Sequence, residues 1–332
     1  MKKVLITGVT GFIGKKLAME LIEDYEVHGL VRGDDGDLPI KYHEADLLDY
    51  EALKNVVKAV EPHFVIHLAA QTEVEKSFYD PTSFSETNYV GTVNLIEAIH
   101  HAEVKNLELF VFSSTMETYG WQDKKDWVAF NEQTPQYPNA PYAVAKLACE
   151  YYIQYAARTY GLPYTILRQT NSYGRNDNDF FVVEQFITQM LKNEKEVHFG
   201  NREPYRNFLH IDDLLELYKK IIKNVDLCKN EVFCTGPENV IQIEELAYKI
   251  ADLIGWDGKI YWGKKPERPG EIYYLNSNND KAKKILGWEP KIDLTSGLIT
   301  TINEWQKKLK VPSRKQNQKQ LPYSSTTPSI LP

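Results

Sequence analysis

The segment Thr7-Gly8-Val9-Thr10-Gly11-Phe12-Ile13-Gly14 decides the fold class of this chain. It follows an apolar strand predicted over residues 3–7 and opens a helix predicted over residues 11–22. The glycines at 8, 11 and 14 allow a tight turn, a close approach of the backbone to a pyrophosphate, and close packing of helix on strand. The segment therefore predicts a dinucleotide-binding turn; the competing interpretation is a glycine-rich turn without a ligand.

Apolar strands alternate with amphipathic helices around and after this segment. Strands are expected over 3–7, 25–32, 41–45, 64–69, 108–113 and 164–168, and helices over 50–60, 81–101, 142–160, 181–192, 211–223 and 243–253. Continuous apolar strands between helices are typical of a parallel sheet covered on both faces. The sequence therefore predicts an α/β fold, a Rossmann doubly wound parallel sheet with a smaller mixed α/β C-terminal substrate lobe.

We expect two domains followed by a tail. Residues 1–170 form the nucleotide-binding domain, to which later segments return, and residues 171–310 form the substrate lobe. Residues 311–332 are rich in Lys, Gln, Ser, Thr and Pro, which predicts a loosely ordered polar tail.

Composition narrows the classes of function. The 332 residues carry 39 Lys and Arg against 46 Asp and Glu, a net charge of −7, which argues against a nucleic-acid partner. The sequence has no apolar run long enough to span a membrane. The three cysteines have neither a paired spacing nor a metal-binding pattern, so we expect a cytoplasmic protein without a metal site.

The end of the second predicted strand bears on the choice of cofactor. Folds that bind NAD usually carry a carboxylate there for the ribose 2′-hydroxyl, whereas this chain has Arg32, which can accommodate a 2′-phosphate. NADP(H) is therefore favoured and NAD(H) stays open, since Arg32 could also stack on adenine or face solvent. Asp46 is placed either to reach the adenine edge or to cap a helix.

Tyr142 and Lys146 are the candidate catalytic pair. Four residues apart on a predicted helix, they share one face. The phenol of a tyrosine ordinarily has a pKa near ~10, and an ammonium one turn away lowers it. The pair can thus supply a base for a hydroxyl proton. The hydroxyls of Ser113 and Thr115 lie at the end of a predicted strand, where ligands of open α/β sheets bind; an ordinary Ser/Thr turn or a surface Tyr/Lys pair is the alternative.

Taken together, these motifs resemble the extended short-chain dehydrogenase/reductase family, and within it the nucleotide-sugar epimerases and dehydratases, including GDP-mannose 4,6-dehydratases and 4-keto-sugar reductases. The resemblance runs from residue 1 to about residue 308. It includes the segments 67–71, 88–92, 113–120, 168–174, 206–213, 268–271 and 281–290.

The resemblance implies roles for individual residues. Tyr142 is the base, Lys146 also holds the nicotinamide ribose, and Thr115 polarises the reacting oxygen at sugar C4. The cofactor, tightly bound and recycled, would contact Gly8, Gly11, Phe12, Ile13, Gly14, Arg32, Asp46, Leu47, Leu68, Ala69, Ala70, Ser113, Tyr142 and Lys146. The nucleoside-diphosphate sugar would contact Asn88, Asn171, Arg206 and Arg268. For Arg206, an ion pair with Asp212 or Asp213 is the alternative.

The exact reaction depends on Thr115-Met116-Glu117. Glu117 occupies the position of the dehydratase base, but Met116 replaces the usual acid, and a thioether cannot donate a proton. A 4,6-dehydratase with rearranged acid chemistry is favoured. A 4-epimerase comes next, followed by a 4-keto-sugar reductase or a uronate decarboxylase. A non-catalytic NADP(H) sensor is the remaining alternative, although such proteins typically lose the Tyr or the Lys.

The resemblance also implies a homodimer in which the helices 81–101 and 142–160 of two copies form a four-helix bundle. The candidate contact residues are Val93, Ile96 and Ile99 on the first helix and Ala148, Tyr152 and Tyr155 on the second. The alternative is that these side chains are buried within one chain.

Overall fold

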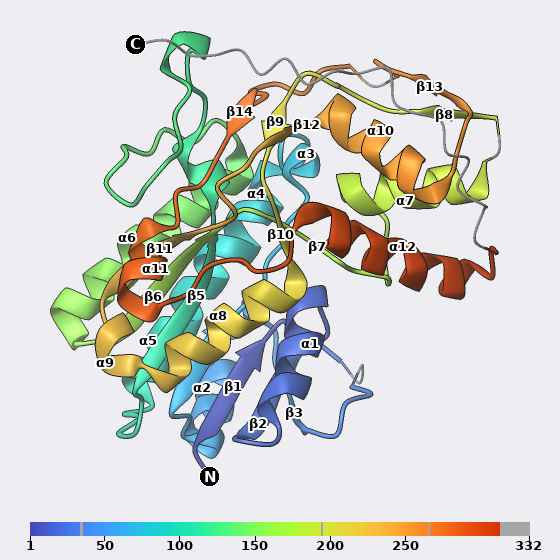
Figure 1. The fold of residues 1–332 in the computed structure, drawn as a ribbon. Helices are drawn as coiled ribbons and strands as arrows, with labels where there is room; N and C mark the ends of the chain where they lie inside the picture. The colour runs from blue at the N-terminus through green and yellow to red at the C-terminus, as the bar shows by residue number, and fades with distance from the viewer. Residues whose placement is uncertain (34–35, 194, 265, 313–332) are drawn as a thin grey trace.

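The computed structural model describes residues 1–33, 36–193, 195–264 and 266–312 (Figure 1). Of the predicted tail, residues 313–332 lie outside the described residues. The larger part is a seven-stranded sheet in the order β11-β6-β5-β4-β1-β2-β3, and every pair of neighbours is parallel. The strands are β1 (Lys3–Thr7), β2 (Glu26–Val31), β3 (Lys41–Glu44), β4 (Phe64–His67), β5 (Leu109–Thr115), β6 (Tyr164–Gln169) and β11 (Glu231–Thr235). The predicted doubly wound parallel sheet is confirmed.

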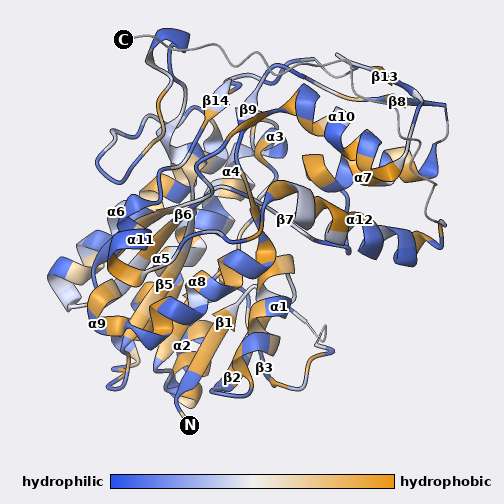
Figure 2. Cartoon of the chain, in the orientation of Figure 1, coloured by the Kyte–Doolittle hydropathy of each residue, from blue (hydrophilic) through white to orange (hydrophobic). Residues whose placement is uncertain are grey.

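Alternation along the strands divides the core into two layers. In β1, Val4 and Ile6 belong to one hydrophobic cluster and Leu5 to the other, because successive side chains of a strand point to opposite faces. The first face is covered by α1 (Phe12–Leu21), α8 (Ile211–Lys223), α9 (Val225–Cys228) and α11 (Asp280–Leu286). The second face is covered by α2 (Tyr50–Val60), α5 (Gly91–His101) and α6 (Pro141–Tyr160). Figure 2 shows the apolar strands enclosed by helices whose outer faces are hydrophilic.

The second lobe is a separate layer with its own core, which contains Phe186, Leu246, Leu298 and Trp305. Its helices are α7 (Val182–Lys192), α10 (Ile243–Ile254) and α12 (Leu294–Leu309). Its short strands are β7 (Asn171–Tyr173), β8 (Glu196–His198), β9 (Tyr205–Arg206), β10 (Phe208–His210), β12 (Ile241–Gln242), β13 (Lys259–Tyr261) and β14 (Tyr274–Leu275). They pair as β10-β7, β12-β9-β14 and β13-β8.

The chain crosses between the two layers more than once. β11 pairs in parallel with β6 at the edge of the large sheet, although it follows α7 and β8 in the chain. Helices α8 and α11, also from the second half, pack on the same sheet. The boundary expected between residues 170 and 171 stays a prediction, because the later segments interleave with both cores.

The helix predicted over 81–101 has a more complex form. It consists of α4 (Pro81–Phe84), a π-helical segment η1 (Ser85–Val90) and α5. Ile96 and Ile99 are buried against the sheet, so their predicted role in a dimer interface is wrong. On α6, the predicted contact residue Tyr155 is exposed, whereas Ala148 and Tyr152 are half-buried. Val144 and Tyr151, which were not predicted, are also exposed on this helix.

The remaining short elements are α3 (Val74–Ser77) and the 3₁₀ turns η2 (Met116–Tyr119) and η3 (Lys124–Asp126). Within the part of the chain that the structure describes, none of the helices combines the length and the apolar character needed to cross a membrane.

Candidate active site

A cavity of about 1260 Å³ lies where the carboxyl ends of the large sheet's strands meet the second lobe. It is lined by the glycine segment and also by Thr115, Glu117, Tyr142 and Lys146. All the predicted site residues line it except Asn88. Asn88 is buried in η1, where its side chain accepts a hydrogen bond from the Gln71 amide (2.8 Å) and donates one to the Gln71 carbonyl (3.0 Å). Asn88 therefore supports one wall of the cavity from behind.

The glycine segment has the geometry of a phosphate cradle. Gly8 adopts a left-handed backbone conformation, with φ of 70°. A Cβ atom on Gly14 would lie 2.2 Å from the Gly8 carbonyl oxygen, so only glycine allows this packing of α1 on the turn. Gly11 caps α1, and a Cβ atom there would have only the Gly8 carbonyl oxygen nearby, at 3.2 Å. The start of α1 thus leaves open backbone facing the cavity, which fits the pyrophosphate of a dinucleotide.

The cavity extends from the glycine segment to the end of β2. Arg32 is exposed there and lines the cavity beside Asp46 and Leu47. The Asp46 carboxylate accepts a hydrogen bond from the Leu48 amide (2.8 Å), whereas the cap of α2 is Asp49. The alternative of Asp46 as an ordinary helix cap is therefore wrong, and Asp46 stabilises the turn that precedes α2.

Tyr142 and Lys146 project from the first two turns of α6 into the floor of the cavity. Burial raises the pKa of the Tyr142 phenol and the nearby Glu117 carboxylate raises it further, while a hydrogen bond with the Thr115 hydroxyl lowers it. The Lys146 amine donates to the Ser113 carbonyl at 2.8 Å. Burial lowers the pKa of Lys146 to about 8. The phenol and a hydroxyl thus meet where a substrate oxygen could exchange a proton.

A cluster of two arginines and two carboxylates forms the opposite wall. One oxygen of Glu271 lies 3.0 Å from Nη2 of Arg206 and 3.0 Å from Nη2 of Arg268. Nη2 of Arg268 also lies 3.8 Å from Oε1 of Glu117. The alternative pairing of Arg206 with Asp212 or Asp213 is wrong, and the Asp213 carboxylate instead accepts hydrogen bonds from the amides of residues 291 and 292. Two guanidinium groups so placed can bind a diphosphate.

Glu271 was not predicted as a site residue. It belongs to the segment 268–271, which carries part of the family resemblance, and this membership is the signal that could have identified it.

Met116 does not take part in the cavity. Its side chain is 1% exposed and packs in a small apolar cluster with Tyr119, Phe130 and Ile272. The residues on either side of it, Thr115 and Glu117, do line the cavity. Glu117 is 9% exposed and is the carboxylate that this segment contributes to the site.

Among the residues described, His, Cys, Asp and Glu form no group of three or more that could hold a metal ion.

Comparison with known proteins gives a consistent result. Residues 5–301 match the family described as GDP-mannose 4,6 dehydratase. The chain is 30% identical to dTDP-D-glucose 4,6-dehydratase of Homo sapiens over 327 residues, which covers 92% of this chain and 89% of the relative.

The solved structures with a similar fold include two UDP-glucose 4-epimerases. One is the UDP-glucose 4-epimerase of Thermotoga maritima with UDP-glucose, at a TM-score of 0.84 and 31% identity, covering 92% of this chain and 99% of the other. The second is the UDP-glucose 4-epimerase of Thermus thermophilus in complex with NAD, at a TM-score of 0.82 and 26% identity, with coverage of 92% and 99%. The family match, the relative and the two structures agree with the cavity that joins a dinucleotide cradle to a pair of arginines. The chain therefore belongs to the GDP-mannose 4,6-dehydratase family and is an enzyme that modifies nucleotide sugars with a nicotinamide cofactor.

Proposed function

We propose that this enzyme is a nucleoside-diphosphate-sugar 4,6-dehydratase that acts through a 4-keto intermediate. The observation that carries the proposal is the place of Glu117, whose carboxylate lines the cavity and acts electrostatically on the Tyr142 phenol. A 4-epimerase needs no second base, whereas a dehydratase needs one for the C5 proton.

In the first step, the phenol oxygen of Tyr142 takes the proton of the C4 hydroxyl. The Thr115 hydroxyl, a hydrogen-bond partner of that phenol, holds the reacting oxygen. We assign stabilisation of the phenolate to the Lys146 ammonium, one turn away on α6. When bound, the nicotinamide supplies the hydride acceptor for C4 and the hydride that completes the cycle.

In the second step, the C4 ketone acidifies the C5 proton, which the Glu117 carboxylate removes. Because Met116 is packed in the core, we assign the second proton transfer to Glu117 as well: the protonated carboxyl returns its proton to the departing C6 hydroxyl, and water leaves. Elimination leaves a double bond between C5 and C6; C6 would then take the hydride that the bound nicotinamide supplies, and C5 would take a proton from solvent, which gives a 4-keto-6-deoxy sugar. Arg206 and Arg268 hold the diphosphate in our proposal, and Asn171, also on the cavity wall, contacts the sugar nucleotide.

The test is an assay with NADP⁺-loaded enzyme and a panel of UDP-, GDP-, dTDP- and CDP-sugars, with products identified by mass spectrometry and NMR. We expect a mass decrease equal to one water and solvent deuterium at C5. We expect Glu117→Gln to lose both signals and Tyr142→Phe to lose all turnover, while both variants still bind NADPH. Wild-type dehydration by Glu117→Gln would reject the assignment of the base, and loss of one carbon dioxide would instead identify a decarboxylase.

A 4-epimerase is the second candidate, and the packing of Met116 favours it, because the position of the usual dehydratase acid is withdrawn from the cavity. An epimerase would give a product of unchanged mass with inverted configuration at C4, and no deuterium at C5. The same assay therefore separates the two reactions.

We also propose that NADP(H) is preferred, which the cation Arg32 at the end of β2 supports. Because its three cysteines are free and buried, we place the enzyme in the reducing cytoplasm.

Finally, we propose a homodimer through α6, on which Val144, Tyr151 and Tyr155 form an exposed apolar stripe. Light scattering should show a dimer for the wild-type protein and for Tyr248→Glu, an exposed control on α10, but a monomer for Tyr151→Glu. A monomeric wild-type protein would reject the dimer.

A further inference from the structure

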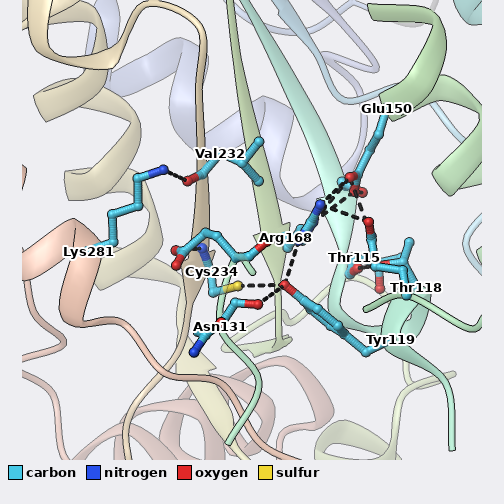
Figure 3. A network of polar contacts seen from close by, with 12 residues as sticks. Thr115, Thr118, Tyr119, Asn131, Glu150, Arg168, Val232, Cys234 and Lys281 are labelled. Carbon is cyan, nitrogen blue, oxygen red and sulfur yellow. Dashed lines mark hydrogen bonds and ion pairs between the residues drawn. The ribbon is translucent and has the colours of Figure 1, made fainter. Parts of the chain in front are cut away.

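Figure 3 shows a buried ion pair, Glu150 with Arg168, in a network of polar contacts that includes Thr115. Glu150, on α6, is completely buried, and Arg168, on β6, is 5% exposed. The pair is bidentate: Nη2 of Arg168 lies 2.8 Å from Oε2 of Glu150, and Nε lies 3.3 Å from Oε1. Neither residue lines the cavity, so neither has a direct role in the proposed chemistry.

The carboxylate end of this pair connects α6 to β5. Glu150 lies one turn after Lys146 and two turns after Tyr142 on the same helix. Its Oε1 accepts a hydrogen bond from the hydroxyl of Ser114, the residue that precedes Thr115. The position of α6 is thereby tied to the end of the strand that carries Thr115.

The guanidinium end connects to the turn that carries Glu117. Nη1 of Arg168 donates to the Tyr119 hydroxyl at 2.6 Å, and Tyr119 is the last residue of η2. That hydroxyl donates in turn to the Asn131 carbonyl at 2.7 Å, and Figure 3 shows it at the centre of the network. The turn is thus held from its far end, two residues beyond Glu117.

Gln136 closes the network on a third side. Its side-chain oxygen accepts a hydrogen bond from Nη2 of Arg168 at 2.9 Å, and its side-chain nitrogen donates one to the Thr118 hydroxyl at 2.8 Å. Thr118 donates to the Thr115 carbonyl at 2.9 Å. One guanidinium therefore reaches both sides of the short turn 115–119, which bears the two proposed catalytic groups Thr115 and Glu117.

The stability of the fold does not by itself explain why a buried ion pair occupies this position. Burying two charges costs desolvation free energy that their attraction only partly offsets, and well-packed apolar residues in the same place are often as stable. What apolar residues cannot supply is direction, because only hydrogen bonds fix the turn and the helix at one mutual distance and angle.

We infer that Glu150 and Arg168 are positioning residues that set Thr115 and Glu117 at the working distance from Tyr142 and Lys146. This inference rests on the proposed catalytic roles of those four residues. It predicts that removing the pair lowers kcat far more than it weakens the binding of cofactor and nucleotide. The glycine segment and Arg206 are not part of the network, and Arg268 approaches it only through Glu117, at 3.8 Å.

The experiment compares the wild-type enzyme with Glu150→Leu/Arg168→Met, which replaces both charges by apolar side chains. The matched control is Lys281→Met, which removes an ion pair with Glu231 (2.6 Å) at the outer strand of the same sheet. Turnover is measured on the nucleotide sugar found active in the product assay, and dissociation constants are measured for NADPH, UDP and GDP. We expect kcat to fall about 100-fold in the double variant, while KM and the dissociation constants stay within about threefold. The control should match the wild-type enzyme in every value.

A folded double variant with wild-type kcat would overturn the inference, as would a fall in kcat that is matched by equal losses of NADPH and nucleotide binding. If the double variant does not fold, Gln136→Leu decides the question, since this half-buried residue can be changed without burying a lone charge. It cuts the link from Arg168 to Thr118, and we expect kcat about tenfold lower at an unchanged unfolding temperature; an unchanged kcat would overturn the inference. Wild-type turnover in Tyr142→Phe, by contrast, would reject the proposed catalytic roles themselves.

Discussion

The two glycines at 11 and 14 should fail in different ways when each is replaced by alanine. A Cβ on Gly14 would lie 2.2 Å from the Gly8 carbonyl oxygen and 2.7 Å from the Val9 Cα, and both are backbone atoms that cannot rotate away. A Cβ on Gly11 would meet only the Gly8 carbonyl oxygen, at 3.2 Å, a tight contact that a small shift relieves.

The expected magnitudes follow from these contacts. Forcing an extra methyl into packed backbone costs about 3 kcal/mol at the upper end of the usual range, and alanine regains about 1 kcal/mol in a helix. Gly14→Ala should therefore lose about 2 kcal/mol of unfolding free energy, or roughly 3 °C in unfolding temperature for a chain of 332 residues. Gly11→Ala should unfold within about 1 °C of the wild-type protein, because its one close contact is easily relieved.

The affinity for NADPH, unlike the stability, should fall more in Gly11→Ala than in Gly14→Ala. The methyl of Gly11→Ala would stand between the start of α1 and a bound pyrophosphate, and a lost hydrogen bond to a charged group costs about 2 kcal/mol. We therefore expect the dissociation constant of NADPH to rise about 30-fold. Fluorescence titration with NADPH and thermal unfolding of the ligand-free protein measure the two effects separately. A Gly11→Ala variant that is stable and binds NADPH like the wild-type protein would refute the phosphate cradle.

Three further outcomes are expected. Met116→Asp should lose about 3 kcal/mol of unfolding free energy and gain no dehydration, because it places a carboxylate in an apolar cluster away from the cavity; faster dehydration would contradict this packing. Arg32→Ala should weaken NADPH about tenfold and leave NADH unchanged in titrations, and equal losses for both cofactors would reject a 2′-phosphate contact. Burial holds the pKa of His67 near 3, so between pH 7 and 5 the unfolded chain binds a proton there and the folded chain does not. Stability should consequently fall as the pH falls, and urea titrations should show a loss about 2 kcal/mol larger for the wild-type protein than for His67→Gln; equal losses would show that His67 is protonated in the folded state.

Much of the fold could be predicted because its signals are local. The glycine segment, the apolar strands and the spacing of Tyr142 and Lys146 each depend on residues within a few turns of one another. The packing partners of Ile96 and Ile99 are not local. Both sit on an amphipathic helix, and only the position of α5 over the sheet shows that they face the core. The Glu150–Arg168 pair was missed for the same reason, since only the packing of α6 on β5 and β6 brings it together.

At position 116, the chemical type of the side chain must be considered together with the direction in which that side chain points. The resemblance placed the usual dehydratase acid at Met116 and drew attention to its thioether. Yet side chains alternate along β5, where Phe110 and Phe112 face one helix layer and Val111 faces the other. The alternation does not continue to the end of the strand, where Ser113, Ser114 and Thr115 all line the cavity, and residues 116–119 form the 3₁₀ turn η2. Within this turn Met116 packs in the core while Glu117 lines the cavity, so the direction of residue 116 follows from the turn and not from the strand pattern. This direction explains why the proposed elimination relies on one carboxylate: with residue 116 directed away, Glu117 is the group of this segment that can both accept the C5 proton and return it to the leaving hydroxyl.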